Sequence, residues 1–188
     1  RIQIQNKNPP FEVSSEDCNT LLVYVRTCVK AAMERETVPF LQNPSQPLLL
    51  KKATFVTLKT EGELRGCIGQ IEPIDPLWKS AKEMSLKAAR EDYRFPALKP
   101  KDPFQIEISI LSPPKPISKE EILVGKHGLI VEAHGKRGVL LPHVATEYKW
   151  NKNTFLEKTI QKANLPKSII RSSEFVLKSF QTFILTEF

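Results

Sequence analysis

The stretch ATFVTLKTEGELRGCIGQI, residues 53–71, decides the fold class because its pattern predicts a β-hairpin. Residues 53–58 are rich in β-branched and aromatic side chains, which favour a strand. Glu61-Gly62 predicts a tight turn, and residues 64–71 predict the partner strand. Strands joined by such a short turn pair antiparallel, so we expect the chain to contain an antiparallel sheet.

The rest of the sequence predicts helices and further strands. Apolar residues recur at helical spacing from Ser14 or Ser15, either of which is a suitable N-cap, to about Glu36. Asp75-Pro76 predicts the cap and first residue of another helix, which reaches about Arg90. Further elements are expected as strands over 104–110 and 175–185, a hairpin over 129–141, and helices over 142–148 and from about 153 onward. Because these elements show no βαβ rhythm, we predict an α+β fold with a largely antiparallel sheet and flanking helices.

The chain of 188 residues is long enough for one sizeable core or for two small lobes. Pro9-Pro10 interrupts the first residues, so we expect residues 1–14 to form an N-terminal arm and residues 15–188 to form the domain. If the domain has two lobes, we expect the larger to comprise about 15–98 and 142–188, and the smaller about 99–141.

The composition is that of an ordinary globular protein, with 40% hydrophobic and 26% charged residues. No apolar run approaches the roughly 20 residues that span a bilayer, and the first residues lack the apolar stretch of a secretory signal. We therefore expect a cytoplasmic protein without a membrane partner. Cys18, Cys28 and Cys67 form no metal-binding spacing, and all three are expected to be reduced.

The net charge of +7 could attract nucleic acid or another polyanion. Lys51, Lys52, Arg90 and Arg94 are the candidates for phosphate contacts. The alternative is a solvated surface: 20 of the 28 basic residues are Lys and 17 of the 21 acidic residues are Glu, an enrichment typical of thermophile proteins with ion-pair networks. The sequence leaves both interpretations open.

The hexapeptide Leu64–Gly69 places a thiol, a guanidinium and two glycines together. In a strand, Arg65 and Cys67 share one face, and a cation beside a thiol lowers its pKa and favours the reactive thiolate. Gly66 and Gly69 are expected either to let backbone N–H groups face an anionic ligand or to permit close packing. The same residues therefore fit a functional cleft or a tight strand in a core.

A cysteine nucleophile usually needs a histidine as its base. His127 lies in a glycine-flanked segment before a predicted strand, and His143 follows a proline at a predicted helix start. His134 lies at a hairpin tip, where solvent exposure is expected. The spacings of seven and nine residues put no two histidines on one helix face, so no metal site is predicted.

Several segments together resemble the AMMECR1 family, of which Leu64–Gly69 matches the signature. The resemblance spans roughly residues 15–188. Two positions depart from the family pattern: many members have Gln at the position of His143 and Asp at the position of Asn151. The further matching segments are, in order, Ala88-Ala89, Asp92–Pro96, Glu107–Pro113, Gly125–Val131, Leu140–Ala145, Trp150, Phe155-Leu156 and Phe180.

The resemblance implies a two-lobed α+β domain with the hexapeptide around Cys67 as its functional centre. It attaches no reaction to that centre and implies no cofactor. Prokaryotic members of the family occur beside, or fused to, Memo-like and radical-SAM proteins, which implies a shared pathway. The departure at His143 weakens any scheme that uses this residue as a base.

The first functional hypothesis is a binding module for a polyanion, such as nucleic acid, or for a partner protein. It is centred on a cleft around Arg65 and Cys67. The further binding candidates are Gly66, Gly69, Arg94 and His143.

The second hypothesis is a cysteine-dependent enzyme that acts on a small anionic substrate. Cys67 is its functional centre, Arg65 orients the anionic group and lowers the thiol pKa, and His127 is the acid or base. A reactive thiolate distinguishes this hypothesis from the first.

Overall fold

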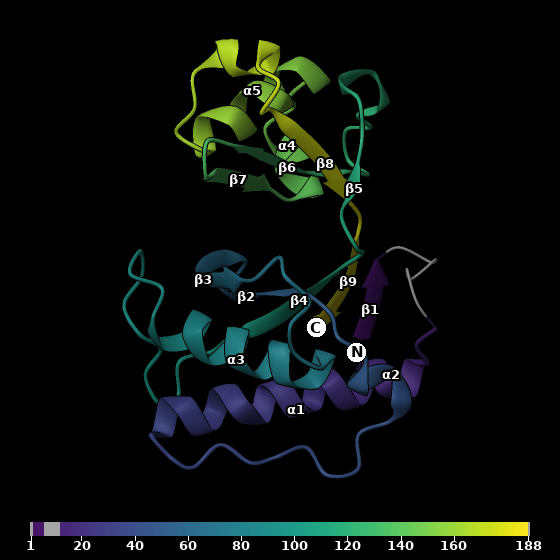
Figure 1. Cartoon of the computed structure of the whole chain (residues 1–188). Helices are drawn as coiled ribbons and strands as arrows, with labels where there is room; N and C mark the ends of the chain where they lie inside the picture. The colour runs from purple at the N-terminus through teal and green to yellow at the C-terminus, as the bar shows by residue number, and fades with distance from the viewer. Residues whose placement is uncertain (1, 6–11, 188) are drawn as a thin grey trace. The chain divides into compact units, whose positions relative to one another are not determined.

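The computed structural model describes residues 2–5 and 12–187 (Figure 1). Its helices and antiparallel strands confirm the predicted α+β class. The chain divides into two compact units, which we call unit 1 (Arg1–Leu111 with Phe183–Phe188) and unit 2 (Ser112–Thr182). Within the described residues, no helix combines the length and apolar character needed to cross a membrane.

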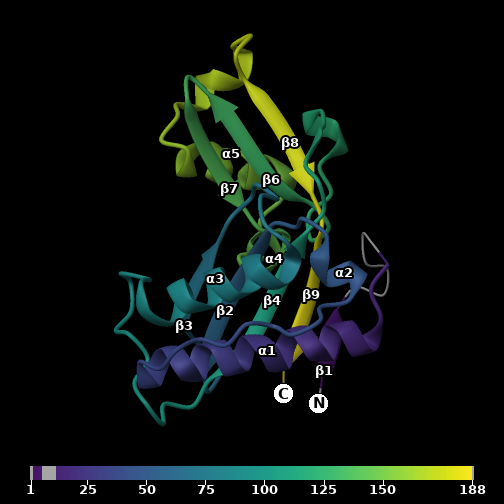
Figure 2. The same cartoon turned by 60° about the horizontal axis from the view of Figure 1, so that its bottom comes forward.

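Unit 1 is built on a five-stranded sheet in the order β1-β9-β4-β2-β3. Helices α1 (Ser15–Glu34) and α3 (Leu77–Arg90) cover one face of this sheet, with the short α2 (Gln46–Leu49) beside them (Figure 2). The predicted hairpin is confirmed, and its second strand, β3, is an edge of the sheet. The strands are β1 (Ile2–Gln5), β2 (Thr54–Thr60), β3 (Glu63–Gly69), β4 (Gln105–Leu111) and β9 (Thr182–Glu187).

The core of unit 1 is formed by the apolar residues that recur at helical spacing in the helices and at every second position in the strands. Helix α1 starts at a capping box, in which Ser14 and Asp17 satisfy each other's backbone N–H groups, and presents a buried apolar stripe. Alternate residues of β2 and β4 meet this stripe from the sheet. Fully buried members of the core are Val25, Val29, Val56, Leu58, Leu77, Ala81, Ile106, Ile108, Ile110 and Leu185.

Unit 2 has a four-stranded sheet in the order β5-β8-β6-β7. The predicted second hairpin is present, and it turns through His134 and Gly135, both with positive φ, as a two-residue turn requires. Helix α5 contributes Phe155, Leu156 and Ile160 to a separate core. The elements are β5 (Lys115–Pro116), β6 (Gly128–Ala133), β7 (Lys136–Leu140), β8 (Val176–Phe180), α4 (Pro142–Glu147), α5 (Lys152–Lys162) and the 3-10 helices Lys119–Glu121 and Lys167–Arg171.

Two local predictions are wrong. The single strand expected over 175–185 is two strands, because the chain leaves the sheet of unit 2 after Phe180 and enters that of unit 1 after Gln181. Asp75 does not cap α3: Pro76 is the N-cap residue without a side-chain bond, and the Asp75 carboxylate accepts a hydrogen bond from Lys79 Nζ at 2.6 Å. The ammonium group of Lys79, one helical turn away, thus occupies the carboxylate oxygen of Asp75 that an N-cap would use to accept a backbone N–H.

The division of the chain also differs from the lobes expected from the sequence. Residues 142–182 lie in unit 2 and not with residues 15–98, because β8 pairs with β6 and α5 packs on the β6–β7 hairpin. Of the expected N-terminal arm, residues 2–5 form β1, which pairs with β9, while residues 6–11 lie outside the described residues.

Candidate functional site

The hexapeptide lies on β3, where residues 66–69 alternate between the two sides of the sheet. The pairing with β2 shifts by one residue between Leu58 and Lys59, so Arg65 has no cross-strand partner. Gly66 is buried on the side covered by α3. Cys67 is half-buried on the other side, opposite Thr57 of β2. The residues directly across from it on this face, Thr57 of β2 and Glu107 of β4, are polar, in contrast to the apolar face that packs on the helices. The expected grouping of Arg65 with Cys67 on one face assumed an uninterrupted alternation, and the irregularity at Arg65 interrupts it.

The loop that follows α3 binds the outer edge of β3 at Cys67. The backbone N–H of Cys67 donates to Asp92 Oδ2 at 2.9 Å, and Arg94 Nη2 donates to the Cys67 carbonyl at 3.1 Å. Arg94 also donates to both carboxylate oxygens of Asp92, from Nε at 2.9 Å and from Nη2 at 2.7 Å. We call this arrangement the Asp92–Arg94 clasp. It satisfies the two backbone groups that an edge strand otherwise leaves unpaired.

Asp92 is a buried carboxylate held in its charged form. Its side chain is 2% exposed, and its pKa is lowered to about 2, chiefly by the hydrogen bonds from Arg94 and against the opposing effect of burial. The backbone N–H groups of Cys67 and Arg94 stabilise the same charge. Because Arg94 neutralises Asp92, the clasp as a whole offers little net positive charge to a ligand.

The thiol of Cys67 is not activated by Arg65. Burial raises the pKa of Cys67, against the opposing effects of the Thr57 hydroxyl, which donates to Sγ at 3.2 Å, and of the Arg94 charge. Arg65 instead lies with its Nη2 4.0 Å from Asp102 Oδ2. The expectation of a thiol pKa lowered by Arg65 is therefore wrong: desolvation outweighs the nearby cation, and that cation is Arg94.

Both glycines of the hexapeptide serve close packing. A Cβ on Gly66 would lie 2.1 Å from the backbone oxygen of Ala88 in α3, so only glycine allows the helix to approach β3 this closely. A Cβ on Gly69 would lie 2.1 Å from the ring of Phe55, its cross-strand partner. An aromatic ring that covers a cross-strand glycine is a recognised way to stabilise a sheet. The expectation that these glycines open backbone N–H groups to a ligand is not supported by this packing.

We predict that Gly66→Ala destabilises unit 1 by about 1–3 kcal/mol, because the added methyl group meets backbone that cannot rotate away. Gly69→Ala is expected to cost less, since the half-buried Phe55 ring can move. Denaturant unfolding of both variants measures the order, with Glu63→Ala as an exposed control in the same strand. A Gly66→Ala protein as stable as the control would contradict the packing role.

The clasp also predicts a pH dependence. Because the folded-state pKa of Asp92 is depressed, its contribution is complete above the unfolded pKa of about 4 and is lost as pH falls toward about 2. We expect wild type to exceed Asp92→Asn in unfolding free energy by on the order of 2 kcal/mol at pH 7. That difference should shrink between about pH 4 and pH 2. A difference that stays constant over this range would show that the carboxylate charge is not what stabilises the loop.

All three histidines of the chain lie in unit 2, so unit 1 offers Cys67 no histidine base of its own. His127 is half-buried, its Nδ1 accepts the Leu123 N–H at 3.3 Å, and burial lowers its pKa. His143 is exposed in the first turn of α4, where its carbonyl accepts the Thr146 hydroxyl. The His134 ring is partly exposed and lies 2.8 Å from Glu174.

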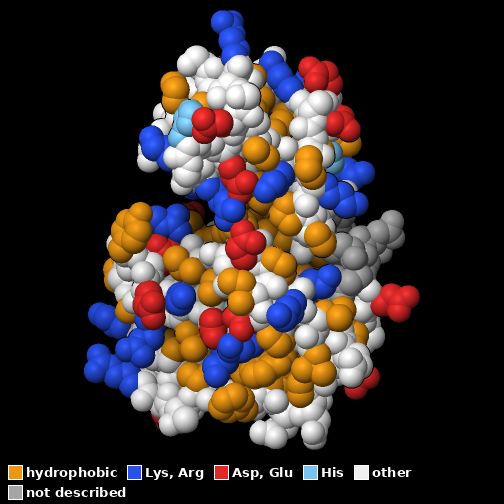
Figure 3. All heavy atoms as spheres, viewed as in Figure 1, with side chains coloured by type: hydrophobic (Ala, Val, Ile, Leu, Met, Phe, Trp, Pro, Cys, Tyr) orange, Lys and Arg blue, Asp and Glu red, His pale blue; other side chains and the backbone are white. Residues whose placement is uncertain are grey.

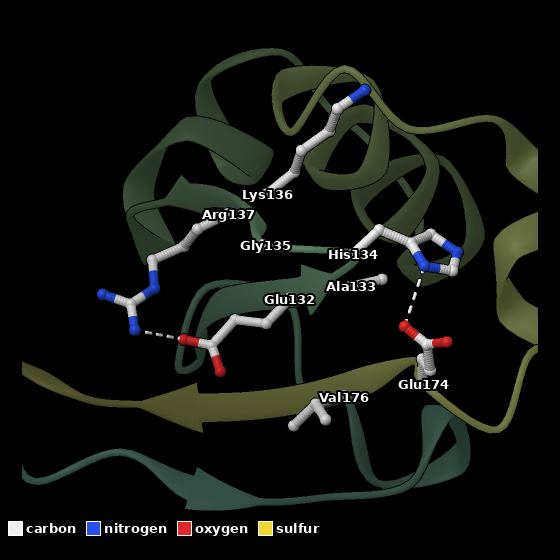
Figure 4. Close-up of a pocket in the computed structure, with 8 residues that line it drawn as sticks. All are labelled: Glu132, Ala133, His134, Gly135, Lys136, Arg137, Glu174 and Val176. Atoms are coloured by element: carbon white, nitrogen blue, oxygen red, sulfur yellow. Dashed lines mark ion pairs between the residues drawn. The ribbon is translucent and has the colours of Figure 1, made fainter.

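A cavity of about 520 Å³ surrounds His134 in unit 2 (Figure 4). Its charged groups compensate one another: His134 faces Glu174, and Glu132 binds both Arg137 and Lys178. We therefore interpret the cavity as a surface hollow with satisfied side chains. Its lining residues are Glu132, Ala133, His134, Gly135, Lys136, Arg137, Glu174 and Val176.

The basic candidates of unit 1 do not form one patch. Lys51 and Lys52 contact Pro76 and Asp75 at the start of α3, whereas Arg90 ends that helix of 14 residues, about 20 Å away. Arg94 follows Arg90 and is already paired in the clasp. On the face seen in Figure 3, Lys and Arg side chains are interspersed with Asp and Glu.

The charge excess lies elsewhere. Unit 2 contains twelve Lys and Arg against six Glu, a net charge of +6, whereas the remainder of the chain contains sixteen against fifteen. Whole-chain counting missed this asymmetry, which becomes visible only when the unit boundaries are known. The stacked rings of Tyr148 and Trp150 in the same unit were also missed, although both are in the sequence as EYKWN. Among residues 2–5 and 12–187, no three His, Cys, Asp or Glu side chains are grouped so as to hold a metal ion.

Comparison with known proteins gives the context of this fold. The AMMECR1 family model matches residues 22–185. A protein of Methanothermobacter thermautotrophicus is 42% identical over 146 residues, which cover 73% of this chain and 76% of that protein. A protein of Thermofilum pendens is 34% identical over 195 residues, covering 93% and 92%. The crystal structure of the uncharacterized protein PH0010 of Pyrococcus horikoshii superposes with a TM-score of 0.85 at 30% identity, covering 94% of each chain.

Proposed function

The chain belongs to the AMMECR1 family, and we propose that it acts as a binding module for a polyanion, with unit 2 as the binding unit. The observation that carries the proposal is the partition of charge. Unit 2 accounts for +6 of the net charge of +7 in 71 residues, as the difference between twelve basic and six acidic side chains. A concentrated positive potential of this kind attracts polyanions and speeds their association.

The alternative of a thermophile surface explains unit 1 better than unit 2. Ion-pair networks need Lys and Glu in similar numbers, and the residues outside unit 2 have this balance, with sixteen basic and fifteen acidic side chains. Unit 2 has two basic residues for each acidic one. Since both units belong to one protein, adaptation to temperature does not account for the difference between them.

Most carboxylates of unit 2 are already engaged. Glu132 binds Arg137 and Lys178, Glu157 binds Lys167, Glu174 faces His134, and Glu121 caps a 3-10 helix. Several exposed lysines of this unit have no ion-pair partner within the described part of the chain, so their charges are available to a ligand. They are Lys119, Lys126, Lys149, Lys152 and Lys162.

The cysteine-dependent enzyme is the less supported alternative. Its nucleophile would need a lowered thiol pKa, and burial raises the pKa of Cys67. The original centre of the binding hypothesis, Arg65 and Cys67, is weakened as well, because the clasp commits the Arg94 charge to Asp92. We therefore place the binding surface on unit 2.

We predict that Cys67 reacts with iodoacetamide at pH 8 more slowly than a free model thiol, because only the thiolate attacks and burial disfavours it. Mass spectrometry of the intact protein and its peptides locates the label. Cys18, whose pKa burial raises to about 11, is the internal control for an unreactive buried thiol. Labelling of Cys67 faster than the model thiol would favour the enzyme instead.

Polyanion binding predicts retention on immobilised heparin that falls steeply with salt, because phosphate-like or sulfate contacts release counterions. Two matched variants locate the surface, each with five exposed lysines changed to glutamine. The unit 2 variant changes Lys119, Lys126, Lys149, Lys152 and Lys162, and the unit 1 variant changes Lys30, Lys51, Lys87, Lys99 and Lys101.

Both variants have the same net charge, so whole-protein charge cannot explain a difference between them. We expect the unit 2 variant to elute at much lower salt than wild type and the unit 1 variant to elute close to wild type. Circular dichroism at matched temperature confirms folding, since exposed substitutions of this kind usually change stability little. Equal losses in the two variants would contradict the assignment to unit 2, and no retention of wild type would contradict the proposal.

A further inference from the structure

The turn between α4 and α5 holds two aromatic rings against each other. The rings of Tyr148 and Trp150 are stacked, with centroids 5.0 Å apart and planes 17° from parallel. The turn is fixed by its backbone, because the N–H of Trp150 donates to the Ala145 carbonyl at 2.8 Å and Lys149 has a left-handed φ of 53°. Asn151 then caps α5 by accepting the Thr154 N–H at 2.9 Å. The pair is thus preorganised by the fold.

One ring of the pair is anchored and the other is open. Trp150 is half-buried and packs against the core of unit 2. Tyr148 is 63% exposed, with one ring face on Trp150. Within residues 2–5 and 12–187, no other ring or cation packs on Tyr148. The outer face of the Tyr148 ring is therefore a flat apolar surface open to solvent.

A lysine side chain lies close to the aromatic pair. Lys158 Nζ lies 6.0 Å from the centroid of the Trp150 ring. Lys158 also acts, together with Lys119 and Lys167, on the carboxylate of Glu157, whose pKa these three positive charges lower. Of these, Lys167 forms the ion pair with Glu157, at 2.7 Å.

Two more lysines flank the rings in the sequence: Lys149 between them and Lys152 just after them, both exposed. The local acidic group is Glu147, which directly precedes Tyr148. Positive charge therefore still predominates around the rings. An open aromatic face next to several lysines is the combination that single-stranded nucleic acids use, because bases stack on the ring and phosphates contact the cations.

We infer that Tyr148, supported by Trp150, is the base-stacking platform of a single-strand nucleic-acid site, with Lys158 as a phosphate contact. The inference rests on the proposed polyanion binding by unit 2 and gives its ligand a chemical class. It predicts a preference for single strands, because the bases of a duplex are stacked on one another and do not expose a face. Heparin carries negative charge but has no bases. It therefore serves as the probe that separates base stacking from electrostatic attraction.

The test measures fluorescence anisotropy of a labelled, mixed-sequence RNA of about twelve nucleotides, a length within the range of single-strand site sizes. The full chain is used with Tyr148→Ala, Tyr148→Phe and Lys158→Gln. We expect Tyr148→Ala to weaken RNA binding by roughly 5- to 100-fold with an unchanged salt slope, and Tyr148→Phe to retain binding near the wild-type level. We expect Lys158→Gln to reduce the slope of log K against log salt by about 0.7.

Heparin retention of Tyr148→Ala is expected to equal that of wild type, and the annealed duplex of the same RNA is expected to bind more weakly than the single strand. The inference is overturned if Tyr148→Ala leaves RNA affinity unchanged, if it lowers heparin retention as much as RNA binding, or if the duplex binds as tightly. In these cases polyanion binding itself stands, provided that wild type is retained on heparin. Loss of both RNA and heparin binding by the wild-type protein would instead refute the proposed function.

Discussion

The buried carboxylate of Asp92 is the constraint on which the arrangement around the hexapeptide depends. It accepts the outward N–H of Cys67 and is neutralised by Arg94, which in turn donates to the Cys67 carbonyl. Edge β3 is thus closed by a loop and offers no free pair of backbone groups at this position. The loop begins where α3 ends, so the clasp also fixes the C-terminal end of that helix relative to the sheet.

Gly66 completes the same arrangement from the inside. With no side chain there, the backbone of β3 meets the backbone of α3 at Ala88, four residues before Asp92. Two residues of the hexapeptide thus have structural roles. The glycine permits contact with the helix, and the backbone of the cysteine binds the loop that follows α3. The Cys67 thiol is half-buried beside Thr57, and its pKa is raised. The chemistry suggested by thiol and guanidinium in the sequence is therefore largely replaced by packing and hydrogen bonding.

The sequence predicted local elements well because their causes are local. The Glu61-Gly62 turn, the capping residue Ser14 and the alternation in β4 each depend on neighbouring residues, and each appears in the structure. The break at Gln181 depends on which sheet each half of the segment pairs with, and the cation next to Cys67 comes from a loop 27 residues away. Such pairings across long separations leave no periodic signal in a single sequence.

The unit boundaries change how the charge of the chain is understood. Summed over all 188 residues, +7 is a modest excess that either a polyanion-binding surface or a solvated thermophile surface explains. Divided at Ser112 and Thr182, it becomes one balanced unit and one unit of +6. Electrostatic attraction of a ligand depends on local potential, which falls off within about 8–10 Å at physiological salt, and not on the net charge of the molecule. Balanced charges on unit 1 therefore contribute little, whereas the excess of lysines in unit 2 is not cancelled by carboxylates of the same unit.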